Sequence, residues 1–177
     1  MSHGNLINGV LFQAAWFACV LGGAQGSNLW GAAAVASLIV FALLGRTRDH
    51  DLVLGCVAAC IGFVIDTVWI RTGILDYAGA GIAPLWIVML WVGVGLSINH
   101  SLSMFKARPW LGGLLAGASA PLSYLAGERF GAVTIADPWH LALVSLVWAP
   151  LFAAVFALSR VESQPNLRRR SDFERAH

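Results

Sequence analysis

The chain has 177 residues, of which 58% are hydrophobic and only 11% are charged. A soluble globular domain carries about 25% charged residues, so this composition excludes an ordinary soluble protein and a disordered one. The formal net charge of +2 is too small to indicate nucleic-acid binding. Three cysteines, scattered through apolar runs, do not form a disulfide scaffold. The composition therefore predicts an integral membrane protein.

Six apolar runs can be marked as membrane-crossing helices, which need about 20 residues each to cross about 30 Å of hydrocarbon. They cover residues 6–23, 28–44, 52–70, 84–104, 110–126 and 138–158. Because these runs are continuously apolar, they favour helices over a β-barrel, whose strands would alternate apolar and polar residues. We expect an all-α polytopic bundle of six transmembrane helices over residues 1–158, followed by a basic, disordered cytoplasmic tail over residues 159–177.

The distribution of basic residues predicts the orientation of this bundle, because cytoplasmic loops carry an excess of Lys and Arg. Nine of the basic residues follow the second, fourth and sixth runs, and only Arg71 and Arg129 lie on the other side. Both termini are therefore expected in the cytoplasm, and the protein in a bacterial inner membrane. The tail carries three consecutive arginines at 168–170, which we expect to bind anionic lipid headgroups, with docking to a membrane enzyme partner as the alternative.

Small and aromatic residues indicate how the predicted helices pack. Gly113 and Gly117 form a GxxxG pair that favours close helix packing inside the monomer, with a homodimer face as the alternative. Most tryptophans fall near the ends of the runs, as in interfacial belts. Trp16, Trp91 and Trp148 are deeper, and we interpret them as bulk in the core or facing lipid.

Asp66 is the outstanding polar residue, because an ionisable group inside a span is costly and marks a candidate functional site. A rise of 1.5 Å per residue places it about 21 Å from the inner face, in the outer third of the bilayer. Tyr124 reaches a similar level, and His140 lies near the same face. We predict a catalytic group of Asp66, Tyr124 and His140, in which the carboxylate accepts a proton. The alternative is a structural carboxylate that pairs with Arg71 or Arg129, or that caps backbone amides of the glycine-rich loop at residues 71–83.

A second polar group lies near the inner face. It consists of Asn8 and Gln13 in the first run and Asn99 and His100 in the fourth, and we interpret it as hydrogen-bonding contact between helices. The charged segment 46–51 is expected to be a turn. His100 and His140 lie at opposite faces and do not predict a haem site, and no set of ligands completes a zinc site. We therefore expect no cofactor and no metal.

Four segments carry a family resemblance: NGVLFQAAW at 8–16, GFVIDTVWIRTGILDY at 62–77, PLWIVMLWVGVGLSINHSL at 84–102 and PLSYLAGERFGAV at 121–133. With them the chain resembles a family of short bacterial inner-membrane proteins catalogued as domain of unknown function 2878. The resemblance implies a compact multi-pass bundle and no established activity. It also implies that the gene lies near genes for lipid-modifying enzymes. It directs attention to the following polar and aromatic positions: Asn8, Gln13, Asp66, Trp86, Trp91, Asn99 and Tyr124.

Three functions remain open at this point. The first is an accessory or binding protein in lipid or envelope metabolism, which requires no catalytic set. The second is a small intramembrane enzyme that acts on a lipid or isoprenoid through the outer-leaflet cluster of Asp66, Tyr124 and His140. The third is a transporter of a small solute, although the two halves of the chain show none of the inverted repeats typical of transporters. We rank them in this order.

Overall fold

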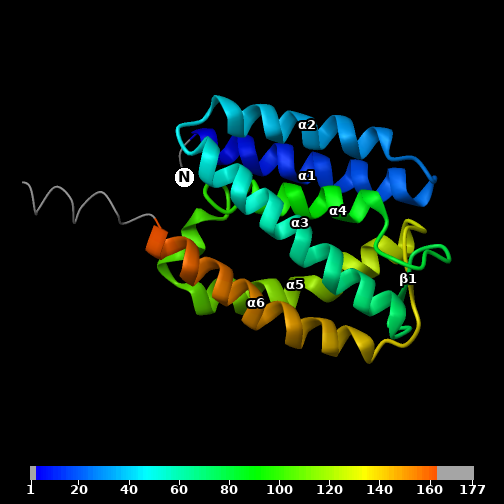
Figure 1. Cartoon of the computed structure of the whole chain (residues 1–177). Helices are drawn as coiled ribbons and strands as arrows, with labels where there is room; N and C mark the ends of the chain where they lie inside the picture. Colours follow the sequence, from blue (N-terminus) through cyan, green and yellow to red (C-terminus); the bar gives the residue numbers. More distant parts are fainter. Residues whose placement is uncertain (1–2, 163–177) are drawn as a thin grey trace, which may run out of the picture.

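The computed structural model describes residues 3–162, and within this range the chain forms six α-helices, one short 3-10 helix and a two-stranded sheet (Figure 1). The elements are α1 (His3–Ala24), α2 (Leu29–Leu44), α3 (Arg48–Arg71), β1 (Leu75–Asp76), α4 (Leu85–Gly95), η1 (Ser103–Ala107), α5 (Pro109–Arg129), β2 (Thr134–Ile135) and α6 (His140–Glu162). The expected all-helical class is confirmed. The predicted tail lies outside the described residues from 163 onward, and residues 159–162 extend α6.

Three of the helices, α1, α3 and α6, are long and apolar enough to cross a membrane. Two further apolar helices are shorter, with 16 residues in α2 and 11 in α4. Leucine, valine and other large apolar side chains on these helices point outward and are exposed, which a lipid environment would cover. The fold is therefore that of a membrane protein.

The fourth run differs from its expected single helix over residues 84–104. The helix ends at Gly95, after a length of about 16 Å at 1.5 Å per residue. The chain continues through turns to η1, and Leu96, Ser97 and Ile98 in these turns are buried. Irregular backbone at membrane depth is tolerated where protein surrounds it and satisfies its polar groups.

Asn8 on α1 satisfies part of this irregular backbone. Its side-chain amide donates to the Leu96 carbonyl at 3.3 Å, and its Oδ1 accepts from the Ser101 backbone N–H at 3.3 Å and from the Ser101 hydroxyl at 2.7 Å. Asn8 is fully buried. One side chain on α1 therefore holds the segment after α4 in place.

The helices form two groups (Figure 1), which are joined by η1, packed on α5 and α6, and by the ring contact between Trp91 of α4 and Trp148 of α6. In one group, α1 packs on α2 and α4, and α4 packs on α3; in the other, α5 packs along α6. Added Cβ atoms at Gly113 and Gly117 would overlap Ala149 of α6, so these glycines allow the two backbones to approach closely. The GxxxG pair thus packs inside the chain, as the preferred interpretation expected.

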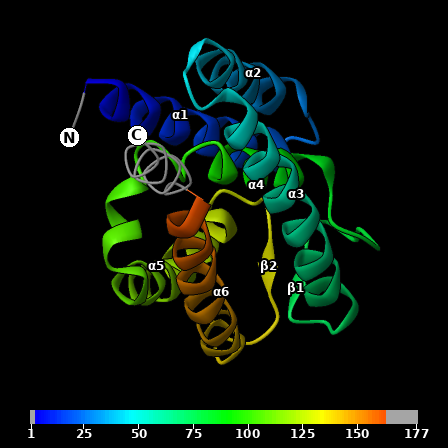
Figure 2. The same ribbon diagram turned by 60° about the vertical axis from the view of Figure 1, so that its left-hand side comes forward.

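The short sheet ties the two groups together at one end of the molecule (Figure 2). β1 follows α3 and pairs antiparallel with β2, which follows α5, in the register Leu75 to Ile135 and Asp76 to Thr134. The sequence alone predicts no strand in residues 71–83, which lie between two of the apolar runs. The pairing fixes where this segment leaves the end of α3, and so it positions the residues that follow β1.

Candidate functional site

Asp66 on α3 is fully buried and lies at the centre of a hydrogen-bonded cluster. Its Oδ2 accepts from the indole nitrogen of Trp91 at 2.8 Å, and its Oδ1 accepts from the hydroxyls of Tyr77 at 2.7 Å and Tyr124 at 3.2 Å. An ionised carboxylate makes only such acceptor contacts. We call Asp66, Tyr77, Trp91 and Tyr124 the Asp66 cluster.

Arginine does not balance the carboxylate of Asp66. The alternative in the sequence analysis was an ion pair with Arg71 or Arg129, but both side chains are exposed. The ion pairs among residues 3–162 join Arg48 to Asp49 and His100 to Asp51. The carboxylate of Asp66 is therefore stabilised by neutral hydrogen-bond donors and not by a positive charge.

The position of Trp91 depends on a glycine of α3. A Cβ at Gly62 would overlap the Cγ and Cδ1 atoms of Trp91, so the bare backbone of Gly62 makes room for the indole ring. Gly62 and Asp66 are four residues apart and therefore lie on one face of the helix. The ring lies over the first residue, and its nitrogen reaches the carboxylate of the second.

The position of Tyr77 depends on the turn after β1. Ala78 and Gly79 take positive φ angles of 53° and 77°, and the Gly79 N–H donates to the side chain of Asp76 at 2.7 Å. This tight turn directs the buried Tyr77 side chain back toward α3. Burial, together with the neighbouring Tyr124 and Asp66, raises the pKa of Tyr77 well above its ordinary value. The phenol therefore keeps its proton and remains a donor.

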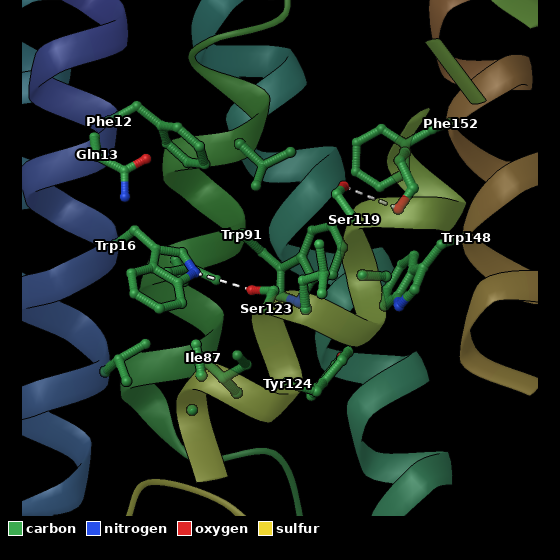
Figure 3. A pocket seen from close by; sticks show the side chains of 18 of the residues that line it. Phe12, Gln13, Trp16, Ile87, Trp91, Ser119, Ser123, Tyr124, Trp148 and Phe152 are labelled. Carbon is green, nitrogen blue, oxygen red and sulfur yellow. Dashed lines mark hydrogen bonds between the residues drawn. The ribbon is translucent and has the colours of Figure 1, made fainter. Parts of the chain in front are cut away.

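A cavity of about 810 Å³ adjoins the Asp66 cluster and lies between α1, α4, α5 and α6 (Figure 3). Tyr77, Trp91 and Tyr124 form part of its wall, whereas Asp66 lies behind them. Most of the remaining wall is aliphatic or aromatic. Figure 3 shows Phe12 and Trp16 on α1 facing Ser119 and Ser123 on α5, and Phe152 on α6.

The gap between α1 and α5 is bridged by polar and aromatic contacts. The indole of Trp16 donates to the hydroxyl of Ser123 at 3.1 Å (Figure 3). The rings of Trp16 and Phe17 both lie edge-on to Phe130, with centroids 6.4 and 6.2 Å away. Phe17 and Phe130 are each 42% exposed, and Leu122, also on the wall, is 67% exposed. The cavity thus opens sideways between these two helices.

The model of the family described as Protein of unknown function (DUF2878) matches residues 5–154 of the chain. The chain belongs to this family. The match confirms the resemblance drawn from the four sequence segments, and it covers every residue of the Asp66 cluster. No curated protein and no solved structure matches the chain.

The structure of this DUF2878 chain brings together only part of the predicted catalytic group. Asp66 and Tyr124 are joined by a hydrogen bond, as the depth estimate suggested. His140 begins α6, its backbone N–H bonds to the Asp137 carbonyl, and its buried Nδ1 has no partner among the described residues. It is not among the hydrogen-bond partners of Asp66. The other two donors to Asp66 were not part of the predicted group. Tyr77 lies in the segment between β1 and α4, and Trp91 was interpreted from the sequence as bulk in the core or facing lipid.

The polar group at the other end of the DUF2878 fold has a centre that the sequence analysis missed. Asp51, assigned there to a charged turn, lies in the first turn of α3 and is fully buried. It accepts from Asn99 at 2.6 Å and from Thr47 at 2.8 Å, and it contacts Nε2 of His100 at 2.9 Å. Lys106 donates to Asn99 in turn. This network joins α3 to the segment that follows α4.

The four residues of the predicted inner-face group therefore separate into three environments. Asn99 and His100 bind Asp51, Asn8 binds the backbone after α4, and Gln13 lies on the cavity wall. Within the range 3–162, no three His, Cys, Asp or Glu side chains are grouped so that they could hold a metal ion. The Asp66 cluster therefore borders the cavity together with Gln13, whereas Asn8 and the Asp51 network are not among the residues that line it.

Proposed function

We propose that this DUF2878 protein is a multi-pass protein of the bacterial inner membrane that binds a lipid and acts as an accessory in lipid or envelope metabolism. The observation that carries the proposal is the cavity of about 810 Å³ between α1 and α5. Ligand cavities typically measure about 300–1,000 Å³ and combine an apolar wall with a few polar groups. This cavity has such a wall, and the phenols of Tyr77 and Tyr124 provide polar groups on it.

The side opening favours a ligand that arrives from the bilayer. Phe17, Leu122 and Phe130 are both on the cavity wall and exposed. In a membrane these side chains would face acyl chains, so a lipid could enter without crossing water. A polar solute would have to lose its hydration against an aromatic wall, which is unfavourable. This argument ranks lipid binding above the transport of a small polar solute.

The proposed topology has six spans with both termini in the cytoplasm. Successive helices would then cross the membrane in opposite directions. Because α4 is short, the turns after it and η1 would complete the fourth crossing. This arrangement puts Arg46, Arg48, Lys106 and Arg108 on the cytoplasmic side, as the excess of basic residues in inner loops requires. The Asp66 cluster would lie toward the opposite face, and the Asp51 network toward the cytoplasm.

The lipid-binding proposal can be tested by filling the cavity. Ala116 and Ala120 on α5 line it, whereas Ala118 on the same helix is exposed and does not. The protein is placed in phosphatidylcholine nanodiscs with cetyl alcohol that carries a photoactivatable diazirine at its chain end. We expect the probe to label peptides of α1, α4 and α5, and Ala120→Phe or Ala116→Phe to abolish this labelling. Ala118→Phe, which adds the same bulk outside, should leave it intact.

Equal labelling of the three variants and the unmutated protein would contradict the proposal, because the label would then report only the surrounding bilayer. Each variant must elute as the same monodisperse species before labelling, so that a loss of signal cannot be attributed to misfolding. Ala116→Phe provides a second obstruction one helical turn from the first.

A second candidate function is that of an intramembrane enzyme that acts on a lipid or isoprenoid at the same site. It is favoured by one observation: Tyr124 lines the cavity, and its hydroxyl is hydrogen-bonded to Asp66 Oδ1 at 3.2 Å. A phenol in this position could pass a proton between a bound lipid and the carboxylate, which is the role of a general acid–base pair. His140 is not part of this version of the site.

A further inference from the structure

The chemistry of the phenols restricts what a bound headgroup can be. Tyr77 and Tyr124 each use their single O–H to donate to Asp66 Oδ1. A phenolic oxygen that has donated its proton can still accept a hydrogen bond. Tyr77 and Tyr124 line the cavity, so a ligand that reaches either phenolic oxygen meets an acceptor and must itself bring the donor.

The charges around the cavity impose a second restriction. All of its lining residues lie within the described range, and they include no Lys, Arg, His, Asp or Glu. Headgroups that carry phosphate or carboxylate are held in proteins by Arg, Lys or several N–H donors. Here such a group would instead meet phenol oxygens, with the carboxylate of Asp66 directly behind them. An anionic headgroup is thus disfavoured at this position.

A cationic headgroup is also poorly matched. Asp66 is fully buried and both of its oxygens already accept hydrogen bonds, so an ammonium group in the cavity does not reach the carboxylate. The phenols stand between the carboxylate and the cavity. An ammonium ion would gain aromatic faces and phenol oxygens in place of its water, but no direct ion pair, and burial of an unpaired charge is unfavourable.

Resting on the proposed lipid-binding function, we infer that the cavity selects a single-chain lipid with an uncharged hydroxyl head, a long-chain alcohol. Its chain would lie along the apolar wall between α1 and α5, and its hydroxyl would donate to the oxygen of Tyr124. A volume of about 810 Å³ is within the range for one ligand of ordinary size.

The inference is tested by competition among probes that share one chain. The protein in phosphatidylcholine nanodiscs is labelled with the diazirine-bearing cetyl alcohol, and unlabelled competitors are added: cetyl alcohol, cetyl methyl ether, cetyl phosphate and cetylamine. We expect the methyl ether, which cannot donate, to compete about 3- to 10-fold more weakly than the alcohol, as the loss of one hydrogen bond implies. The phosphate and the amine should compete at least as weakly as the ether.

Tyr124→Phe separates the headgroup contact from chain binding. This variant keeps the aromatic ring but removes the acceptor, so the preference for the alcohol over the ether should fall to about one while both still compete. Tyr77→Phe is the second test of the same pair of phenols and should reduce the preference. Ser119→Ala also removes one hydroxyl from the wall of α5, but that hydroxyl donates to the Ala116 carbonyl and is not part of the Asp66 cluster. It should therefore retain the preference.

The outcomes distinguish the two proposals. If diazirine-bearing forms of all four compounds leave the cavity peptides unlabelled, the proposed lipid-binding function fails and the inference fails with it. If the alcohol, ether, phosphate and amine compete equally, or if a charged probe competes best, lipid binding stands and the inference is overturned. A preference for the alcohol that Tyr124→Phe and Tyr77→Phe both leave unchanged would also overturn the assignment of the headgroup to these phenols.

Discussion

Gly62 on α3 and Trp91 on α4 occupy complementary space, and this fit sets the hydrogen bond at the centre of the molecule. A Cβ at Gly62 would overlap the five-membered ring of Trp91, whose nitrogen donates to Asp66 at 2.8 Å. The Trp91 ring also lies close to the ring of Trp148 on α6, with centroids 4.6 Å apart. One glycine therefore affects contacts among three helices.

Gly62→Ala should destabilise the fold, because the added methyl displaces Trp91 from Asp66. Overpacking of this kind costs about 1–3 kcal/mol, and the weakened hydrogen bond adds to that loss. The measurement is the free energy of unfolding in mixed micelles titrated with sodium dodecyl sulfate. Gly9→Ala is the control: it is also helical, and its Cβ would lie 3.4 Å from Ser101, an ordinary contact. It should be neutral or stabilising, by up to about 1 kcal/mol. Equal effects of the two substitutions would refute the proposed fit.

Sequence reasoning could locate Asp66 and Tyr124 because depth in a span follows from residue counting. The same counting could not identify Trp91 as a donor, since an indole in an apolar run has the same pattern whether or not its nitrogen is bonded. Tyr77 was also out of reach as a partner, because its position depends on pairing between two strands of two residues each. Strands this short carry no detectable alternation of apolar and polar residues.

Asp51→Asn should destabilise the protein at the other end of α3. The carboxylate accepts from Thr47 and Asn99 and contacts His100, whereas an amide offers one acceptor oxygen and two N–H groups that face other donors. Buried polar atoms left without partners cost about 1–3 kcal/mol. Asp49→Asn is a matched control two residues away, because the Asp49 side chain is 87% exposed. It should change the free energy of unfolding by less than about 0.5 kcal/mol. A similar small change for Asp51→Asn would show that the network contributes little.

Asn8→Ala should loosen the segment that follows α4. The substitution removes the partners of the Leu96 carbonyl and the Ser101 backbone N–H, two groups that the irregular backbone cannot satisfy within a helix. We expect a loss of about 1–3 kcal/mol in the free energy of unfolding and faster amide hydrogen exchange over residues 96–102. Asn28→Ala is the control, since Asn28 is exposed and its side chain does not cap α2. Unchanged hydrogen exchange in the Asn8 variant would mean that the turns at residues 96–102 are stable without the Asn8 hydrogen bonds.

These two predictions also show why the end of the molecule that holds Asp51 was harder to predict from the sequence than the end that holds Asp66. Hydropathy is continuous across Gly95, so nothing in the composition marks the end of α4 there. Asp51 stands in a charged stretch that resembles a solvated turn, and its burial depends on Asn99 and His100, almost fifty positions later. Asn8, Asn99 and His100 do make polar contacts with other elements, but the residue at the centre of the network, Asp51, is defined by tertiary packing alone.

The proposed orientation predicts opposite labelling of two loops. In a chain with Cys19, Cys56 and Cys60 replaced by alanine, Gly81→Cys and Ala107→Cys each provide one exposed position. A membrane-impermeant maleimide added to spheroplasts should label the first, and should label the second only after the membrane is permeabilised. Labelling of both loops in intact spheroplasts, or the reverse pattern, would contradict six spans with cytoplasmic termini.

Comparative lipid analysis of a deletion strain should separate lipid binding from catalysis. Ala120→Phe obstructs the cavity, and Tyr124→Phe leaves it open but removes the hydroxyl between cavity and carboxylate. If the protein is an accessory that binds lipid, a lipid species altered by the deletion should be restored by the unmutated protein and by Ala118→Phe, but not by Ala120→Phe. Tyr124→Phe should restore it in part, because the chain still binds. If Tyr124 transfers a proton, Tyr124→Phe should instead fail completely while retaining photolabelling by the alkyl probe, since general acid–base groups contribute about 10²- to 10⁴-fold in rate. If Ala120→Phe fully restores the lipid species at matched membrane abundance, the cavity is required neither for lipid binding nor for catalysis.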